Sequence, residues 1–166
     1  MTLTREINEQ FNEQIGMEYA SFWLYRAMGC WAMERNWPGF AHWLALQSEE
    51  ERRHAERLIE YVIDRFGSVR LGELAKPPYE WGSLAALFEQ AYKQEQGVTA
   101  AILERISACE KVGDRASVLA LDWFVTEQVE EEKQTEDICS RLRLIGDSPA
   151  GILMLDAELA MRKDEI

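Results

Sequence analysis

Two residue types that bind metal ions stand one helical turn apart in the first third of the chain. Residues 50–54 read Glu-Glu-Arg-Arg-His, so Glu51 and His54 are separated by three positions. In a helix this spacing places both side chains on the same face. A carboxylate and an imidazole arranged in this way are typical ligands of a metal ion in the core of a helical bundle.

Further polar residues interrupt the apolar stripes of the neighbouring helical segments, where an apolar side chain recurs every three or four positions. The interrupting residues are Glu18, Glu51, Glu95, Gln128 and Glu131. The first four of them each lie about 12 to 14 residues from the expected start of their helix, which at about 1.5 Å per residue puts them at one height. The sequence therefore predicts a polar layer across the middle of an apolar core.

Several carboxylates in an apolar core would each cost roughly several kcal/mol unless protons or cations neutralise them. No Lys or Arg occupies the same stripe positions, so divalent metal is the simplest partner. Oxygen ligands with a single imidazole suit iron or manganese, with zinc as a competitor, and disfavour haem or copper. Two alternatives remain: a polar network without metal, and, for any single Glu, a solvated helix face.

Glycine, proline and capping residues divide the chain into helical segments, and no alternating strand pattern competes with them. We expect long helices at about residues 4–34, 37–66, 83–112 and 114–145, and a short helix at about 149–161. Residues 67–82 form the one long connection, which can extend to roughly 50 Å and so traverse a helix of roughly 40 Å. The predicted fold class is all-α, a four-helix bundle with one long crossover and a short C-terminal fifth helix.

The composition narrows the classes of partner and location. A length of 166 residues predicts a single domain over residues 1–166, and a net charge of −12 argues against nucleic acid or an anionic membrane as a partner. No uncharged stretch reaches about 20 residues and no signal pattern opens the chain, so we expect a cytoplasmic protein. Cys30, Cys109 and Cys139 are far apart and form no Cys-x-x-Cys, which favours reduced thiols over disulfides or a zinc site.

The same residues resemble the ferroxidase motifs of bacterial ferritins, and the resemblance extends over essentially the whole chain. Its motifs are Asn12-Glu13-Gln14 through Glu18 with Tyr25, Glu50-Glu51-Arg52-Arg53-His54, Tyr92-Lys93-Gln94-Glu95-Gln96, and Trp123 through Glu127-Gln128-Val129-Glu130-Glu131-Glu132-Lys133. The resemblance implies a ferritin-like bundle with two iron ions in each subunit. One ion would be held by Glu18, Glu51 and His54, and the other by Glu51, Glu95 and Glu131, with Glu51 as the bridge and Gln128 at the border of the second ion.

The resemblance also implies an accessory third iron site formed by Glu50, Glu127 and Glu130. An acidic run such as residues 130–132 is, alternatively, a solvated helix face. Bacterioferritins resemble the pattern too, but they have Glu-x-x-His in the last long helix and a haem-binding Met where this chain has Arg52, so we expect no haem. The missing Cys-x-x-Cys likewise argues against a rubrerythrin-like electron-transfer module.

The function that the resemblance implies is iron storage with ferroxidase activity. O2 or H2O2 would oxidise the two ferrous ions, and ferric mineral would collect in a homo-oligomeric cage of two dozen subunits. Tyr25 and Trp123 are candidate redox-active residues near the iron or, alternatively, core packing. Because the amide of Gln128 is a neutral ligand, we expect the second ion to be held weakly, which favours storage. Two other functions stay open: a di-iron oxidase or peroxidase that stores no mineral, and a helical scaffold with vestigial carboxylates.

Apolar residues outside the core stripes predict contacts between subunits. Tyr19, Trp23, Leu24 and Trp31 extend the apolar surface of the first helix, and residues 152–155 form a second apolar patch. Either patch could instead cover the end or side of its own bundle. His42 lies off the core stripe, so we expect it at the surface and not among the ligands.

Overall fold

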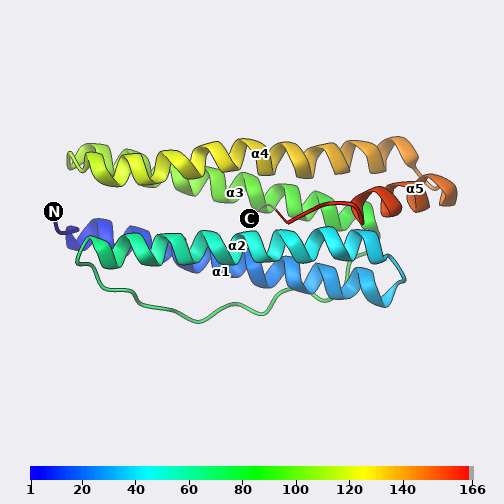
Figure 1. The fold of residues 1–166 in the computed structure, drawn as a ribbon, viewed down its shortest axis with the longest axis horizontal. Coiled ribbons are helices and arrows are strands. Elements are labelled where there is room, and N and C mark those ends of the chain that lie inside the picture. Colours follow the sequence, from blue (N-terminus) through cyan, green and yellow to red (C-terminus); the bar gives the residue numbers. More distant parts are fainter. Residues whose placement is uncertain (165–166) are drawn as a thin grey trace.

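The chain forms two helical hairpins packed side by side, as a computed structural model that describes residues 1–164 shows (Figure 1). The helices are α1 (Arg5–Glu34), α2 (Pro38–Asp64), α3 (Leu84–Lys111), α4 (Arg115–Ile145) and the short α5 (Pro149–Leu159). α1 pairs with α2, α3 pairs with α4, and α5 packs against α2 and α4. The predicted fold class is confirmed, and each helix begins and ends within about two residues of its expected range. The extent of the domain stays a prediction.

The segment between α2 and α3 runs along the whole bundle, so that α2 and α3 point in the same direction (Figure 1). Two asparagines of α1 form hydrogen bonds with the first residues of this crossover segment. The Asn8 side chain accepts a hydrogen bond from the Ser68 amide (2.8 Å) and donates one to the Ser68 carbonyl (3.1 Å). Asn12 donates to the same carbonyl (2.9 Å) and accepts from the amide of Arg70 (2.5 Å). The crossover is therefore tied to α1 from its beginning.

Side-chain caps set the helix starts that the sequence predicts. Four residues accept a hydrogen bond from the backbone N–H three positions further on: Thr4, Ser83, Asp114 and Ser148. Pro38 occupies the first turn of α2, where its missing N–H leaves no gap in the helix. Gly113 (φ 71°) and Gly146 (φ 54°) follow α3 and α4 in the left-handed region that favours glycine.

The apolar core is split into two clusters by a layer of buried polar side chains. One cluster, near the α5 end, includes Tyr25, Phe40 and Phe88, and the other, at the opposite end, includes Phe11 and Ile102. The buried polar residues of the layer are Gln14, Glu18, Ser21, Gln47, Ser48, Glu51, His54, Glu95, Gln128, Glu131 and Thr135. Each of the four long helices passes from one cluster through this layer to the other, so the helices themselves set the height of the polar residues.

The expected surface residues divide into buried and exposed ones. Leu24 and Trp31 pack inside their own bundle, with 7% and 5% of their surface exposed, whereas Trp23 is 45% exposed. Leu24 and Trp31 therefore cover their own bundle, which was the alternative to a contact between subunits. In the C-terminal patch Leu155 is buried against the bundle, and Met154 is exposed.

Three smaller expectations can also be compared with the structure. His42 is exposed, as predicted. The three cysteines are free, with Cys30 exposed and the other two, Cys109 and Cys139, buried. Within residues 1–164, no helix has the length and apolar character needed to cross a membrane.

Gly67, at the junction of α2 and the crossover, allows a close approach that a side chain would prevent. A Cβ atom there would lie 2.4 Å from Asn8 Oδ1 and 2.8 Å from Val62 Cγ1. We expect Gly67→Ala to lower the free energy of unfolding by about 1–3 kcal/mol. As a control, Gly97→Ala on an exposed face of α3, where a Cβ meets nothing within 4 Å, should raise it by about 0.5–1 kcal/mol. Thermal unfolding followed by circular dichroism measures both, and equal midpoints would contradict this account of the junction.

Candidate metal centre

Five side chains from four helices converge in the polar layer. Glu18 comes from α1, Glu51 and His54 from α2, Glu95 from α3 and Glu131 from α4. Within residues 1–164 they form two groups, Glu18 with Glu51 and His54, and Glu51 with Glu95 and Glu131. In each group one possible ligand atom per residue lies within 4.8 Å of the others. The shared Glu51 stands where a ligand that bridges two metal ions would stand.

The five ligand candidates are removed from water. Glu18, Glu51 and Glu95 are fully buried, and His54 and Glu131 are each 6% exposed. The arrangement follows from the helix periodicity, because Glu51 and His54 lie on one face of α2 and the other carboxylates reach the same height from the facing helices. The buried layer is therefore a candidate metal site, and none of these four carboxylates lies on a solvated helix face.

Two glutamines that we did not predict as site residues orient the carboxylates. Gln14 Nε2 donates to Glu18 Oε1 at 2.6 Å. Gln47 Nε2 donates to Glu51 Oε1 at 3.2 Å and to Glu131 Oε1 at 3.3 Å, so one amide joins two of the ligand helices. Both glutamines precede a predicted ligand by four residues on the same helix face, a spacing that was visible in the sequence.

Glu95 receives its hydrogen bonds from α1 and α4. The buried Tyr25 hydroxyl donates to Glu95 Oε1. From the opposite side, Gln128 Nε2 donates to Glu95 Oε2 at 3.2 Å and lies 3.3 Å from Thr99 Oγ1. Tyr25 and Gln128 thus both touch a ligand candidate, as the sequence led us to expect, although their roles stay predictions.

The donors are too few to satisfy the cluster. Glu18 Oε2, Glu51 Oε2, Glu131 Oε2 and His54 Nδ1 are buried side-chain atoms without a hydrogen-bond partner among the described residues. Buried polar atoms are nearly always paired, so four unpaired atoms on members of the two ligand groups require an explanation. Divalent cations would give these atoms partners, because carboxylate oxygens and a neutral imidazole nitrogen are the ligands that such ions prefer.

Burial also controls which protons the site holds in the absence of metal. It raises the pKa of Glu18 and of Glu95 from 4.5 to about 7, although hydrogen bonds from Gln14 and Tyr25 oppose the rise. The pKa values of Glu51 and Glu131 are raised well above their usual range, first by burial and then by the neighbouring carboxylates. Protons must therefore occupy the cluster near neutral pH unless metal ions displace them.

The surroundings of His54 keep its imidazole neutral, which is the form that can bind a metal ion. Burial, helped by the positive charges of Arg53 and Arg57, lowers its pKa to about 4, so the imidazole is neutral at physiological pH. Its Nδ1 lies 3.9 Å from Glu51 Oε2 and 3.7 Å from Glu131 Oε1. Because the imidazole is neutral, it forms no ion pair with either carboxylate. The ring packs edge-on against Trp123, with ring centroids 5.6 Å apart. Trp123 therefore has a packing role, and its redox role stays a prediction.

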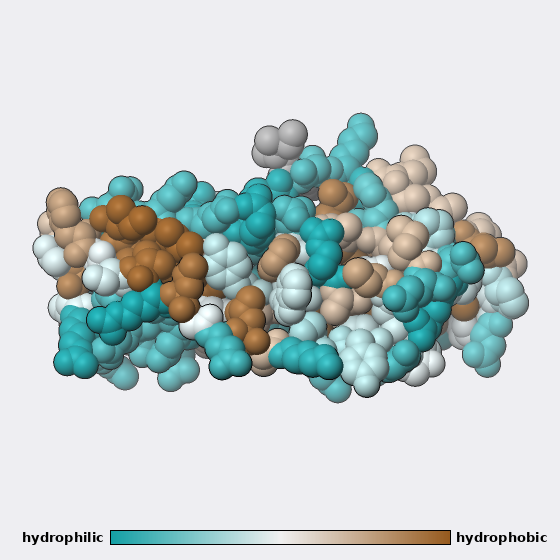
Figure 2. All heavy atoms as spheres, turned by 90° about the horizontal axis from the view of Figure 1, so that it is seen from below, coloured by the Kyte–Doolittle hydropathy of each residue, from teal (hydrophilic) through white to brown (hydrophobic). Residues whose placement is uncertain are grey.

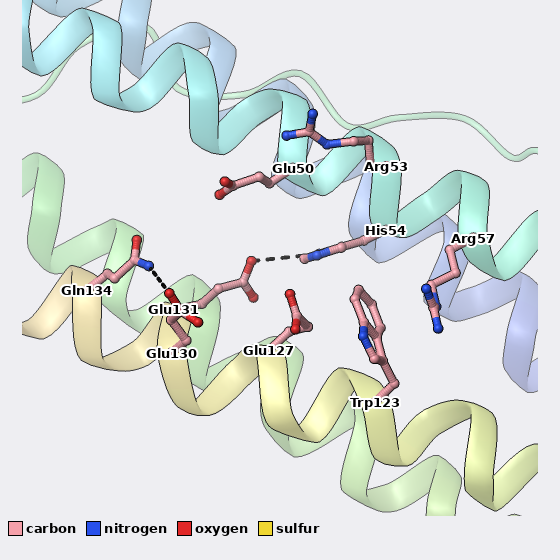
Figure 3. Close-up of a pocket in the computed structure, with 9 residues that line it drawn as sticks. All are labelled: Glu50, Arg53, His54, Arg57, Trp123, Glu127, Glu130, Glu131 and Gln134. Carbon is pink, nitrogen blue, oxygen red and sulfur yellow. Dashed lines mark hydrogen bonds and ion pairs between the residues drawn. The ribbon is translucent and has the colours of Figure 1, made fainter. Parts of the chain in front are cut away.

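A cavity of about 340 Å³ adjoins the cluster on the α2 and α4 side (Figure 3). Its lining residues are Glu50, Arg53, His54, Arg57, Trp123, Glu127, Glu130, Glu131 and Gln134. His54 and Glu131 belong both to the ligand groups and to the cavity wall, so the cavity leads directly to the centre. Its wall carries carboxylates and guanidinium groups together.

The predicted residues of the accessory site lie in the wall of this cavity. Glu50 comes from α2, and Glu127 and Glu130 come from α4 (Figure 3). Their carboxylates are not one of the two close-packed groups found among residues 1–164. Glu50 accepts a hydrogen bond from Arg162, and Glu130 accepts one from Gln134. The third metal site accordingly stays a prediction.

Arg52 and Arg105 lie on two of the ligand helices, and neither is hydrogen-bonded to a ligand candidate. Arg52, at the position of the haem-binding Met of bacterioferritins, pairs on the outside of α2 with Glu49 (2.9 Å) and with Glu56. The absence of haem stays a prediction. Arg105 is buried below the site, and its guanidinium donates to the carbonyl oxygens of Gln10 and Ala101, each at 2.9 Å. It does not reach the ligand carboxylates with a hydrogen bond.

Comparisons with known proteins agree with the observed fold. A model of the ferritin-like domain matches residues 8–145. The chain is 35% identical over 158 residues to the bacterial non-heme ferritin of Escherichia coli O157:H7, covering 95% of this chain and 96% of that protein. It is 35% identical over 162 residues to the corresponding protein of Bacteroides fragilis (strain YCH46), covering 96% and 99%. The open-pore ferritin of the archaeon Archaeoglobus fulgidus superimposes with a TM-score of 0.97 at 37% identity, over 98% of this chain and 100% of that one.

The raised carboxyl pKa values predict how the stability of the metal-free protein depends on pH. Unfolded carboxyls titrate near 4.5, whereas Glu18 and Glu95 in the folded chain titrate near about 7. Folding therefore favours their protonated forms, and this contribution is complete below the unfolded value and is lost as pH rises through the folded one. We expect the midpoint of thermal unfolding of chelator-treated protein to fall between about pH 5 and about pH 8.

Removing the titrating groups separates this effect from general charge repulsion. The variant Glu18→Gln with Glu95→Gln should show a smaller fall over the same pH range, because its site amides cannot ionise. Saturating Zn2+ at the upper pH should restore the midpoint of the unmodified protein, because metal replaces the protons. A pH slope that is the same in both proteins would contradict the assignment.

Proposed function

Because the chain belongs to the ferritin family, as its motifs predicted, we propose that it stores iron and oxidises ferrous ions at the buried carboxylate centre. The observation that carries the proposal is the pair of overlapping ligand groups that share Glu51, with an orphaned oxygen or nitrogen atom on four of their five members. Iron is here the substrate, and the ferric product is deposited as mineral in a cage built from many copies of the chain.

The chemistry follows from the donor set. Two ferrous ions displace the protons that the buried carboxylates hold, one ion at Glu18, Glu51 and His54 and the other at Glu51, Glu95 and Glu131. Each ferrous ion gives up one electron, so the pair reduces O2 to H2O2 with two protons, or H2O2 to two waters with two protons. The anionic oxygen ligands favour the harder ferric product.

The acidic cavity is the proposed route between the centre and the interior of the cage. His54 and Glu131 are reached directly from it, and Glu50, Glu127 and Glu130 give its wall negative charge (Figure 3). Such a wall raises the local concentration of cations. We assign these three glutamates to an accessory iron site through which ions pass after oxidation.

Exposed apolar side chains support self-assembly into the cage. Phe66, Leu71 and Tyr79, on or next to the crossover, are 77%, 66% and 71% exposed. The face that carries the crossover shows a gathering of apolar residues towards one end (Figure 2). Surfaces of this kind are usually covered by another chain. A cage of two dozen copies in the cytoplasm is the arrangement that we propose, as the family resemblance implies.

The first test is an anaerobic titration with ferrous ions followed by exposure to O2. We expect two tightly bound ions per chain, and a particle with about two dozen times the mass of one chain when the same sample is weighed by native mass spectrometry. In Glu51→Gln, which removes the shared ligand but keeps its size, we expect loss of at least one tight ion and a fall in the oxidation rate of about 100-fold or more.

Glu60→Gln is the matched control, because Glu60 is exposed on the same helix and loses the same charge. It should bind and oxidise iron as the unmodified protein does. A small oligomer with intact oxidation would favour the di-iron oxidase or peroxidase that stores no mineral. Absence of tight iron would favour the scaffold and overturn the proposal.

The amide of Gln128 offers a test of storage against retention. A neutral amide beside Glu95 holds a cation less tightly than a carboxylate would. We therefore expect Gln128→Glu to slow reductive release of iron several-fold and to reduce mineral formation. Gln96→Glu adds the same charge on an exposed position of α3 and should change neither quantity. Unchanged release and mineral formation in Gln128→Glu would rule out this role of the amide.

A further inference from the structure

The chain beyond α5 turns back towards the middle of the bundle and lies against α2 (Figure 1). Two contacts hold residues 162–164 of this segment against α2. A ring nitrogen of His42 lies 2.8 Å from the carbonyl oxygen of Arg162, and Arg53 pairs with Asp164 at 2.6 Å. The tail thus has a defined place beside the metal centre.

Between these contacts, the side chain of Arg162 is inserted among residues of α2. Its Nη2 donates to Glu50 Oε2 at 2.6 Å, and its Nη1 donates to Gln47 Oε1 at 3.1 Å and to the Trp43 carbonyl at 3.3 Å. The guanidinium also stacks over the Trp43 ring, 4.6 Å from its centroid. Arg162 and Glu50 expose only 13% and 16% of their side chains, so water screens the pair weakly.

Both partners of Arg162 belong to the surroundings of the metal centre. The Nε2 of Gln47 donates hydrogen bonds to Glu51 and Glu131, whereas its Oε1 accepts one from Arg162, so the guanidinium fixes which end of the amide faces the ligand candidates. Glu50 reaches into the cavity that leads to His54 and Glu131 (Figure 3). The tail therefore places a permanent positive charge at the edge of the centre, on a carboxylate that we assign to the accessory site.

We propose that Arg162 is a tethered cation that competes with divalent metal ions for Glu50, so that the accessory site fills only when the C-terminal tail moves away. The inference rests on the proposed binding of iron at this centre. A guanidinium and a divalent ion on one half-buried carboxylate repel each other, and the short tether gives Arg162 a high effective concentration there. The tail thus keeps the affinity for the accessory ion low. It touches the two core groups only indirectly, through the amide of Gln47.

The test is a calorimetric titration of the assembled, metal-free protein with Zn2+, which binds without redox chemistry. For the unmodified protein we expect two tight ions per chain followed by a weaker third. In Arg162→Gln the third ion should bind about tenfold more tightly, the effect of removing a charge-assisted contact. Lys163→Gln, which removes the same charge from the exposed neighbouring residue, should leave the third ion unchanged.

A double-mutant cycle shows whether Arg162 acts through Glu50. In the background Glu50→Gln, where nothing is left to compete for, adding Arg162→Gln should not change the affinity for the third ion further. Equal affinities in Arg162→Gln and the unmodified protein, or an effect of equal size in the Glu50→Gln background, would overturn the proposal. Failure of the first two tight ions to bind would instead refute the proposed function, so the two failures are distinguishable.

Discussion

The structure depends on one electrostatic constraint, which is that four carboxylates lie buried together with no lysine or arginine hydrogen-bonded to the ligand cluster among the described residues. Glu18, Glu51 and Glu95 are fully buried, and ionising them all without a counter-charge would cost far more than a domain has in net stability. Protons satisfy this constraint in the metal-free protein up to about neutral pH, and bound divalent ions would satisfy it in their place. Burial raises the pKa values of Glu18 and Glu95, and the unpaired oxygens show that the surrounding donors do not satisfy the carboxylates.

Apolar packing encloses the polar layer towards both ends of the bundle. The hydrogen-bond donors around the layer orient its carboxylates but do not satisfy all of their oxygens. Gln14, Gln47, Gln128 and Tyr25 give the carboxylates enough hydrogen bonds to fix their directions. They leave one oxygen without a hydrogen-bond partner on each of Glu18, Glu51 and Glu131, which belong to the two ligand groups that share Glu51. A fully satisfied polar network would have been stable without metal, and would have left no free ligand atoms. A metal-free site needs carboxylates whose directions are fixed by hydrogen bonds but whose remaining oxygens are still available to a metal ion.

Much of the fold and the ligand set could be predicted, because both follow from local rules. Caps such as Ser83 and Asp114 set the helix starts, and interruptions of the apolar stripes mark the layer. What could not be predicted depends on tertiary contacts. From the sequence, Trp31 could pack within its own bundle or against another chain, and only its burial in the structure shows that it packs within its own bundle. Gln47 had the helical spacing of a supporting residue, but its second bond, to Glu131 on α4, depends on the packing of the helices.

The two sides of the centre differ in how far they are closed. Towards α1 and α3 the ligands are closed in by Gln14 and Tyr25, whereas towards α2 and α4 they open into the cavity. If the cavity wall were only acidic, it would attract iron and also retain it. Arg53 and Arg57 in the wall, and Arg162 on Glu50, offset part of that attraction. A storage protein must release its product. We infer that a wall of mixed charge binds cations more weakly than the strongly acidic centre does, so that ions can leave through the cavity while the ligands of the centre stay unchanged.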